Sequence, residues 1–135
     1  MENTLESLNG LLARLQKLLT LHRQLLESLR AEREALLAMD VRRIQDAALD
    51  KQGILHQITQ AEQDRIAATR EAAALLRAPA GQDTLSNLVL LAQSSSLKLS
   101  DQLRSVQQAL QLLISRIQEQ NLSNQRLVEA SLEHL

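Results

Sequence analysis

Residues 5–36 read LESLNGLLARLQKLLTLHRQLLESLRAEREAL, a stretch in which apolar side chains return every three or four positions. The repeating positions are Leu5, Leu8, Leu12, Leu15, Leu19, His22, Leu26, Leu29 and Leu36. Steps of three and four residues place side chains on one face of an α-helix, and Leu11, Leu18 and Leu25 widen that face. The stretch therefore predicts a first helix from about residue 3 to residue 38 with a buried leucine face.

The composition favours helices throughout the chain. Of 135 residues, 44% are hydrophobic and none is Phe, Tyr or Trp. Aromatic and β-branched side chains favour strands, whereas Leu, Ala, Gln, Glu and Arg lose little rotamer freedom in a helix. We expect an all-α fold, an elongated antiparallel helical hairpin with a third long helix, and a single helical domain spanning residues 1–135.

Two interruptions separate the predicted helices. The leucine stripe pauses at Met39, and Asp40 is a good N-cap for a second helix over about 41–77 that returns antiparallel to the first. Residues 77–82 contain the only proline and a glycine, which predicts a loop. We expect Asp83 to cap a third helix over about 84–135.

The third predicted helix is longer than its partners. Ser94, Ser95 and Ser96 interrupt its apolar stripe; we expect one long helix whose bend, if any, lies there, whereas a full break would give a four-helix arrangement. At 1.5 Å per residue, a continuous helix would span roughly 78 Å against roughly 54 Å for the first two. It would then draw level with the first turn near Asn121 and leave residues 122–135 beyond the hairpin.

Charge and composition exclude several classes of partner. The formal net charge is −1, so no broad basic field is expected to attract nucleic acid. Residues 1–4 lack the basic and apolar regions of a signal peptide, and no apolar run approaches 18 residues, so we expect neither secretion nor a membrane span. The absence of cysteine fits a reducing compartment.

The pattern of titratable residues does not indicate catalysis. His22, His56 and His134 are too far apart in the sequence for a helical metal site, and the carboxylates alternate with Arg and Lys as on solvated helix faces. No glycine-rich phosphate loop or nucleophile elbow is present. We expect no enzyme activity, no metal and no cofactor.

The last helix carries the candidate partner-binding residues. They are Ile117, Asn121, Asn124, Leu127, Val128, Leu132 and Leu135. Asn121 and Asn124 enter the apolar stripe, either as a solvated turn at the end of the bundle or as amides that hydrogen-bond the backbone of a partner segment. Lys51, Glu62 and Arg65 interrupt the stripe of the second helix and read as the margin of a core.

Over nearly its whole length the chain resembles the FlgN family of flagellar export chaperones. The matching residues are Glu32, Arg33, Ala35, Leu36, Asp40, Lys51, Ile54, Leu55, Ile58, Arg65 and the run Asn121-x-x-Asn124-x-x-Leu127-Val128. The asparagine pair followed by Leu-Val is the most distinctive piece. Family members continue past this segment with further helical turns, whereas this chain ends at Leu135 within the stripe.

The resemblance implies a cytoplasmic chaperone. Such a protein binds the C-terminal helical segments of the hook-filament junction proteins and keeps them soluble before export through the flagellar type III apparatus. An alternative from another class is a structural coiled-coil protein that forms a homodimer through its third helix, because self-association and client binding use the same kind of apolar face.

Overall fold

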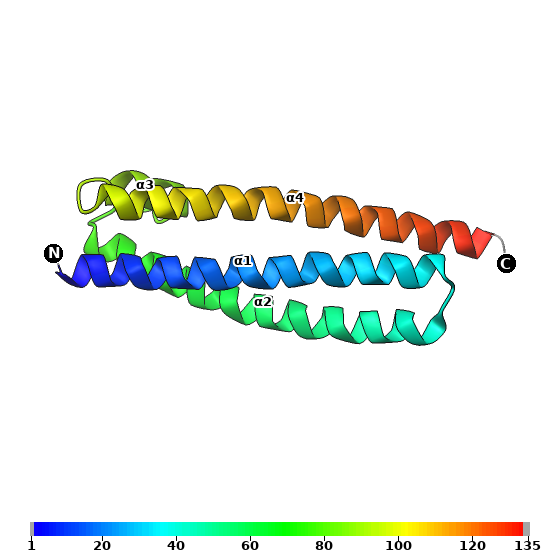
Figure 1. Cartoon of the computed structure of the whole chain (residues 1–135). Coiled ribbons are helices and arrows are strands. Elements are labelled where there is room, and N and C mark those ends of the chain that lie inside the picture. Colours follow the sequence, from blue (N-terminus) through cyan, green and yellow to red (C-terminus); the bar gives the residue numbers. More distant parts are fainter. Residues whose placement is uncertain (1, 134–135) are drawn as a thin grey trace. The chain divides into compact units, whose positions relative to one another are not determined.

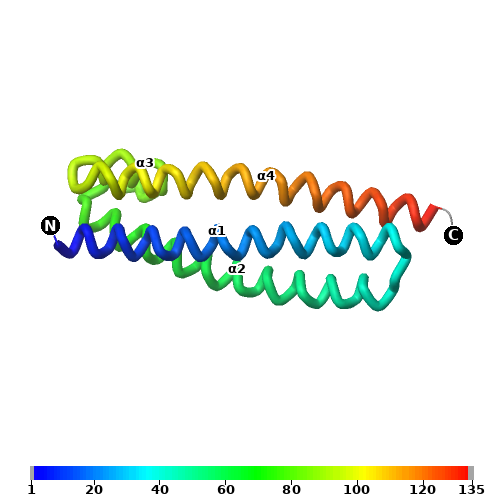
Figure 2. Tube along the Cα trace, viewed as in Figure 1, coloured from blue at the N-terminus to red at the C-terminus, as the bar shows by residue number. Residues whose placement is uncertain are grey.

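The computed structural model describes residues 2–133, which form four α-helices and no strand (Figures 1 and 2). They are α1 (Glu2–Leu37), α2 (Val41–Leu75), α3 (Leu85–Ala92) and α4 (Leu97–Glu133). The prediction of an all-α fold is confirmed. Within the described residues, no helix is both long and apolar enough to cross a membrane.

The turn between α1 and α2 is a helix C-cap followed directly by an N-cap. Met39 adopts a left-handed conformation with φ of 52°, and the amides of Met39 and Asp40 donate back to the carbonyls of Leu36 and Ala35. This 5→2 and 6→1 pairing is a Schellman motif, which stops α1. The Asp40 carboxylate then accepts from the Arg43 amide at 3.2 Å, so Asp40 caps α2 as the sequence predicts.

The end of α2 uses the same motif, two residues earlier than predicted. Arg77 has a φ of 57°, and the amides of Arg77 and Ala78 donate to Ala74 and Ala73. The expectation that Asp83 caps the next helix is wrong. Thr84 is the N-cap of α3 and accepts from the Asn87 amide, while the Asp83 carboxylate lies 3.9 Å from the Arg70 guanidinium.

The long third helix is broken at the serine run, so the four-helix alternative is the one that occurs. The amides of Ser95 and Ser96 donate to the Ala92 carbonyl, and the Ser94 hydroxyl donates to the Leu91 carbonyl, which ends α3. The Ser96 hydroxyl then accepts from the Leu99 amide at 3.2 Å and caps α4. The 37 residues of α4 match the 36 of α1 and 35 of α2, which removes the expected excess length.

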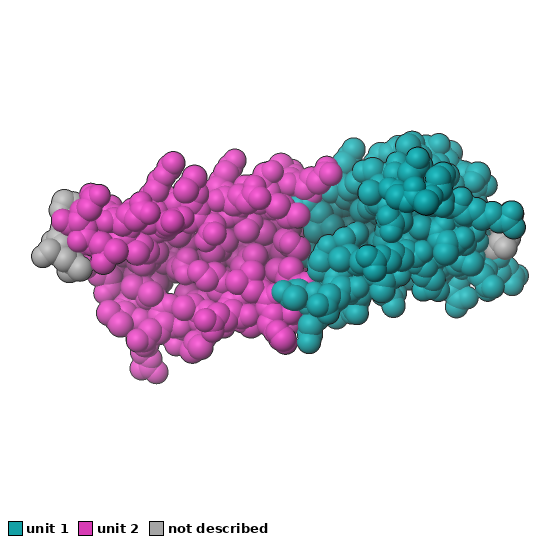
Figure 3. Space-filling view, turned by 180° about the vertical axis from the view of Figure 1, so that it is seen from behind, with its two compact units in different colours: residues 1–19, 59–110 teal, residues 20–58, 111–135 magenta. Residues whose placement is uncertain are grey.

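The described chain divides into two compact units, coloured separately in Figure 3. Unit 1 comprises residues 1–19 and 59–110 and contains parts of all four helices. In it α3 runs antiparallel to α4, since Val89 pairs with Ser100 and Ser86 with Gln107. The buried side chains from the four helices include Leu8, Leu11, Leu15, Ala68, Ala72, Leu88, Val89, Ala92 and Leu103.

Unit 2 comprises residues 20–58 and 111–135, and its described part contains segments of α1, α2 and α4 only. Its apolar centre is the cluster of Leu25 and Leu29 from α1 and Ile54 from α2, against which Ile58 and Ile117 pack. The three helices thus share one small core. The candidate functional residues lie in this unit.

Candidate functional site

A charged pair at the side of the unit 2 core joins α1 to α2. The Lys51 ammonium on α2 lies 2.9 Å from the Glu32 carboxylate on α1, and the two side chains are 29% and 14% exposed. The same carboxylate accepts a second hydrogen bond through its other oxygen, from the Asn124 amide on α4 at 3.0 Å. Glu32 is therefore bonded to both neighbouring helices.

Asn124 lies inside unit 2, with only 2% of its surface exposed. Its side-chain nitrogen also donates to the backbone carbonyl of Leu29 at 2.8 Å, and its oxygen accepts from the Gln120 amide at 3.0 Å. Because both amide hydrogens and the oxygen have partners within the chain, the polar side chain is satisfied in its buried position. Asn124 therefore holds α4 against α1.

A further bond strengthens the same junction. The Arg33 guanidinium on α1 donates to the Ser123 hydroxyl on α4 at 2.6 Å. With Glu32 and Asn124, it makes a polar seam between α1 and the C-terminal half of α4. The expectation that residues 122–135 lie beyond the hairpin is wrong for this segment, because Ser123 and Asn124 contact the last three turns of α1.

Next to the seam, a cavity of about 260 Å³ opens between α2 and α4, with α1 at its base. We call it the α2–α4 groove. Its lining residues are Glu32, Leu36, Ile44, Lys51, Asn121, Asn124, Gln125 and Val128. Val128 is 41% exposed, and Asn121 and Gln125 are exposed as well. The groove therefore combines an apolar wall with exposed amides and a charged base.

The predicted partner-binding residues fall in different places. Asn121, Asn124 and Val128 line the groove, whereas Ile117 packs against the core of unit 2. Leu127 is half-buried and Leu132 is 60% exposed. Leu135 lies outside the described residues. A binding role for these residues stays a prediction, and Asn124 has its hydrogen-bonding groups already engaged within the chain.

The other residues singled out in the sequence have local partners. Arg65 donates two hydrogen bonds to the Glu62 carboxylate one turn before it on α2, at the margin of unit 1. No group of three or more His, Cys, Asp or Glu side chains suited to a metal ion occurs within residues 2–133. His134 lies outside that range.

In unit 1, the short helix α3 lies over α2 and α4, the two helices that flank the α2–α4 groove in unit 2. In unit 1, α3 contacts α4 through the bond from the Ser100 hydroxyl to Val89 and through the bond from Gln107 to Ser86. On the other side, Thr84 and Leu85 at the start of α3 border a cavity with Ile66 and Thr69 of α2. The short helix α3 therefore lies against both α2 and α4.

The same faces of these helices border the groove in unit 2. Eighteen residues make five turns of an α-helix and return to the same face. At this spacing Asn121 follows Leu103, Gln125 follows Gln107, Val128 follows Leu110, and Lys51 precedes Thr69. Leu103 and Leu110 are buried, whereas their counterparts Asn121 and Val128 are exposed; Thr69 is buried and Lys51 half-buried, and Gln107 is half-buried and Gln125 exposed. Of the described residues, none forms a fourth helix over these faces in unit 2.

The sequence pointed to the members of this site but not to their contacts. Glu32, Arg33, Lys51 and Asn124 carry the family resemblance separately, and the hydrogen bonds they form join residues up to 95 positions apart. A single sequence holds no signal for such pairing. Gln125 was missed altogether, although its position one turn after Asn121 could have indicated a shared face.

The comparisons with curated proteins and with solved structures found no match. The comparison with protein families found one that covers residues 1–135, described as FlgN protein. This match spans every residue of the polar seam and of the α2–α4 groove. The chain belongs to the FlgN family of flagellar chaperones.

Proposed function

We propose that this protein binds the C-terminal helical segments of hook-filament junction proteins in the cytoplasm and keeps them soluble until the flagellar type III export apparatus accepts them. Membership of the FlgN family supports a chaperone role in flagellar assembly. The open α2–α4 groove of unit 2 is the observation that supports a helical client and carries the proposal.

The groove suits an amphipathic helix because α3 already covers the equivalent faces in unit 1. The buried residues of α3 are Leu88, Val89 and Ala92, and Leu85 lies one turn before them. A client helix with apolar residues at the same i, i+3, i+4 and i+7 spacing would cover Val128 and leave its polar face in water. Asn121 and Gln125 would supply hydrogen bonds at the edge of the contact.

A short apolar contact of this kind also fits the need for release. Free amphipathic segments aggregate through their exposed apolar face, and covering that face prevents aggregation. The affinity comes from buried apolar area at roughly 25 cal/mol per Å², less the cost of ordering the client segment. A groove with a polar base buries less apolar area than a closed core, so the complex stays reversible.

The test is a calorimetric titration with the C-terminal helical peptide of a hook-filament junction protein. We expect Val128→Asp to weaken binding at least tenfold, because a carboxylate buried against an apolar helix is costly without a free counter-charge, and Lys51 is engaged by Glu32. Leu122→Asp is the matched control, since Leu122 is 47% exposed on the same helix and does not line the groove. Wild-type affinity for Val128→Asp, or an equal loss for Leu122→Asp, would refute the docking site.

Light scattering separates this function from self-association through the same face. A chaperone awaiting its client forms a one-to-one complex when the peptide is added. A structural homodimer instead has twice the chain mass without the peptide, and Val128→Asp would make it monomeric. That second result would favour a structural protein.

A further inference from the structure

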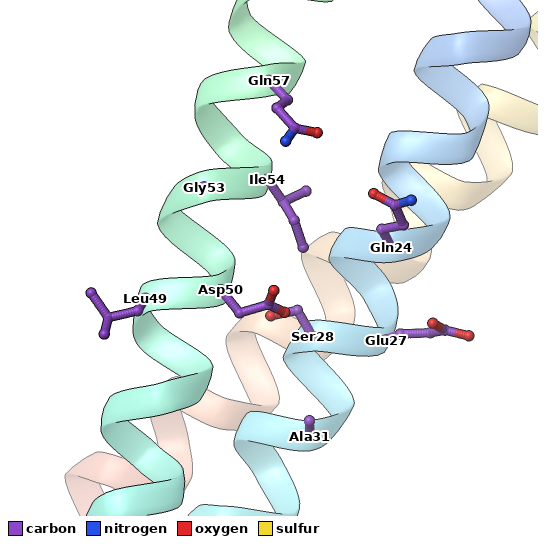
Figure 4. Close-up of a pocket in the computed structure, with 9 residues that line it drawn as sticks. All are labelled: Gln24, Glu27, Ser28, Ala31, Leu49, Asp50, Gly53, Ile54 and Gln57. Carbon is purple, nitrogen blue, oxygen red and sulfur yellow. The ribbon is translucent and has the colours of Figure 1, made fainter.

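A second groove lies on unit 2 between α1 and α2, separate from the α2–α4 groove. It is a cavity of about 540 Å³ (Figure 4). Helix α1 contributes Gln24, Ser28 and Ala31 to it, and α2 contributes Asp50, Gly53 and Gln57. We call it the Ser28 groove. None of its lining residues also lines the α2–α4 groove.

Ser28 is the buried polar group at the base of this groove. Only 4% of its surface is exposed, and its hydroxyl has no hydrogen-bond partner in the described chain. Figure 4 shows the side chain turned toward α2. A buried hydroxyl nearly always has a partner, because leaving it unpaired lowers stability. Ser28 lines the cavity, so a polar group bound there would supply the partner that the described chain does not.

Gly53 stands on the facing side of the groove and leaves it open. A Cβ atom built on Gly53 meets no other atom within 4 Å, so packing does not require a glycine there. A helix with glycine at an interior position is also less stable than the same helix with alanine there. Two residues that each disfavour the fold thus line one groove, and such local conflicts with foldability are typical of binding sites.

The polar groups around the groove are rich in acceptors. Asp50 carries a carboxylate that enters no ion pair within the described residues, and no Lys or Arg lines the groove. In Figure 4 the Asp50 side chain points into the space between the two helices, toward Ser28, and the amides of Gln24 and Gln57 lie above them. Glu27 also lines the groove, but in Figure 4 its side chain points away from α2. One carboxylate directed into the groove, with a hydroxyl and amide oxygens around it, complements a cation that has several donors.

We propose that the Ser28 groove binds a lysine side chain presented by a helix of a partner protein. A lysine ammonium has three donors, which match the Asp50 carboxylate, the Ser28 hydroxyl and an amide oxygen of Gln24 or Gln57. Its aliphatic stem lies along Ala31 and Gly53, whose lack of bulk lets the partner helix approach closely. The exposed glutamine side chains turn aside to admit the ammonium. The Ser28 groove is separate from the α2–α4 groove.

The test uses a helical Ala/Gln peptide with one central lysine and an otherwise identical peptide with norleucine at that position. Binding is followed in the full chain by the backbone amide shifts of Ser28, Asp50 and Gly53 in ¹⁵N spectra. We expect the lysine peptide to bind at least tenfold more tightly than the norleucine peptide, with shifts centred on these residues. Equal binding of the two peptides, or shifts spread over the chain, would overturn the proposal.

Three variants and one small probe sharpen the result. Asp50→Asn should weaken binding of the lysine peptide at least tenfold. Asp46 is an exposed residue one turn earlier, and Asp46→Asn should leave the affinity unchanged. Gly53→Leu fills the open space and should also block binding, with a melting temperature no lower than that of the wild type showing that the fold is intact. n-Butylammonium should bind far more weakly than the peptide. Unchanged binding in Asp50→Asn, or equal affinity for n-butylammonium, would show that no lysine-bearing helix is recognised.

Discussion

Replacing Asn124 by alanine should destabilise the protein far more than replacing Asn121, three residues earlier on α4. Asn124→Ala removes a hydrogen bond to the Leu29 carbonyl and one to the Glu32 carboxylate, at 2.8 and 3.0 Å. A neutral hydrogen bond contributes about 1 kcal/mol and one to a charged group about 1.5–3 kcal/mol. The expected loss in unfolding free energy is therefore about 2.5–4 kcal/mol, or roughly 10–15 °C in melting temperature for a chain of this size.

Asn121→Ala provides the matched control for this measurement. Asn121 is exposed, and its side chain has no hydrogen-bond partner within residues 2–133, so its replacement should change the unfolding free energy by less than about 0.5 kcal/mol. Thermal unfolding followed by far-ultraviolet circular dichroism compares the two variants with the wild type. If Asn124→Ala melts within about 2 °C of Asn121→Ala, the buried seam does not hold α4 to α1, and its structural role is wrong.

Three further substitutions test the local arguments through urea unfolding. Gly53→Ala should stabilise the chain by about 1 kcal/mol, because alanine favours a helix interior and its Cβ meets open space; a loss of stability would mean that the groove is closed. Met39→Gly should stabilise it by about 1 kcal/mol, since Met39 is 76% exposed and left-handed, and no gain would show that the turn carries no strain. Leu103→Ala, at a fully buried position, should cost about 2–5 kcal/mol, whereas a cost below 1 kcal/mol would place Leu103 outside the core.

Much of the fold was predictable because helix faces and N-caps are local features. The leucine stripe located α1, and Asp40 located the start of α2. The ends of α1 and α2 were harder to predict, since Met39 and Arg77 occupy left-handed positions where glycine is the usual signal. Sequence patterns therefore gave the helices to within a few residues, and non-glycine caps limited the precision at their ends.

The serine run shows why one helix was predicted where there are two. Serine hydroxyls can bend a helix, end it or cap the next one, and the sequence does not distinguish these outcomes. In the structure Ser94 helps to end α3 and Ser96 caps α4. Taking the helix as continuous led to the expectation of an unsupported end, and the position of Asn124 beside α1 corrects it.

The polar residues at the base of the α2–α4 groove explain how it stays open. Lys51 and Asn124 stand at positions where an apolar periodicity would place leucine, and leucines there would favour direct packing of α2 onto α4. Instead Glu32 bonds both residues, so α4 is held to α1 by directional hydrogen bonds. Buried polar pairs of this kind specify geometry at some cost in stability. We infer that the seam fixes three helices in place while leaving the position of a fourth free for a client.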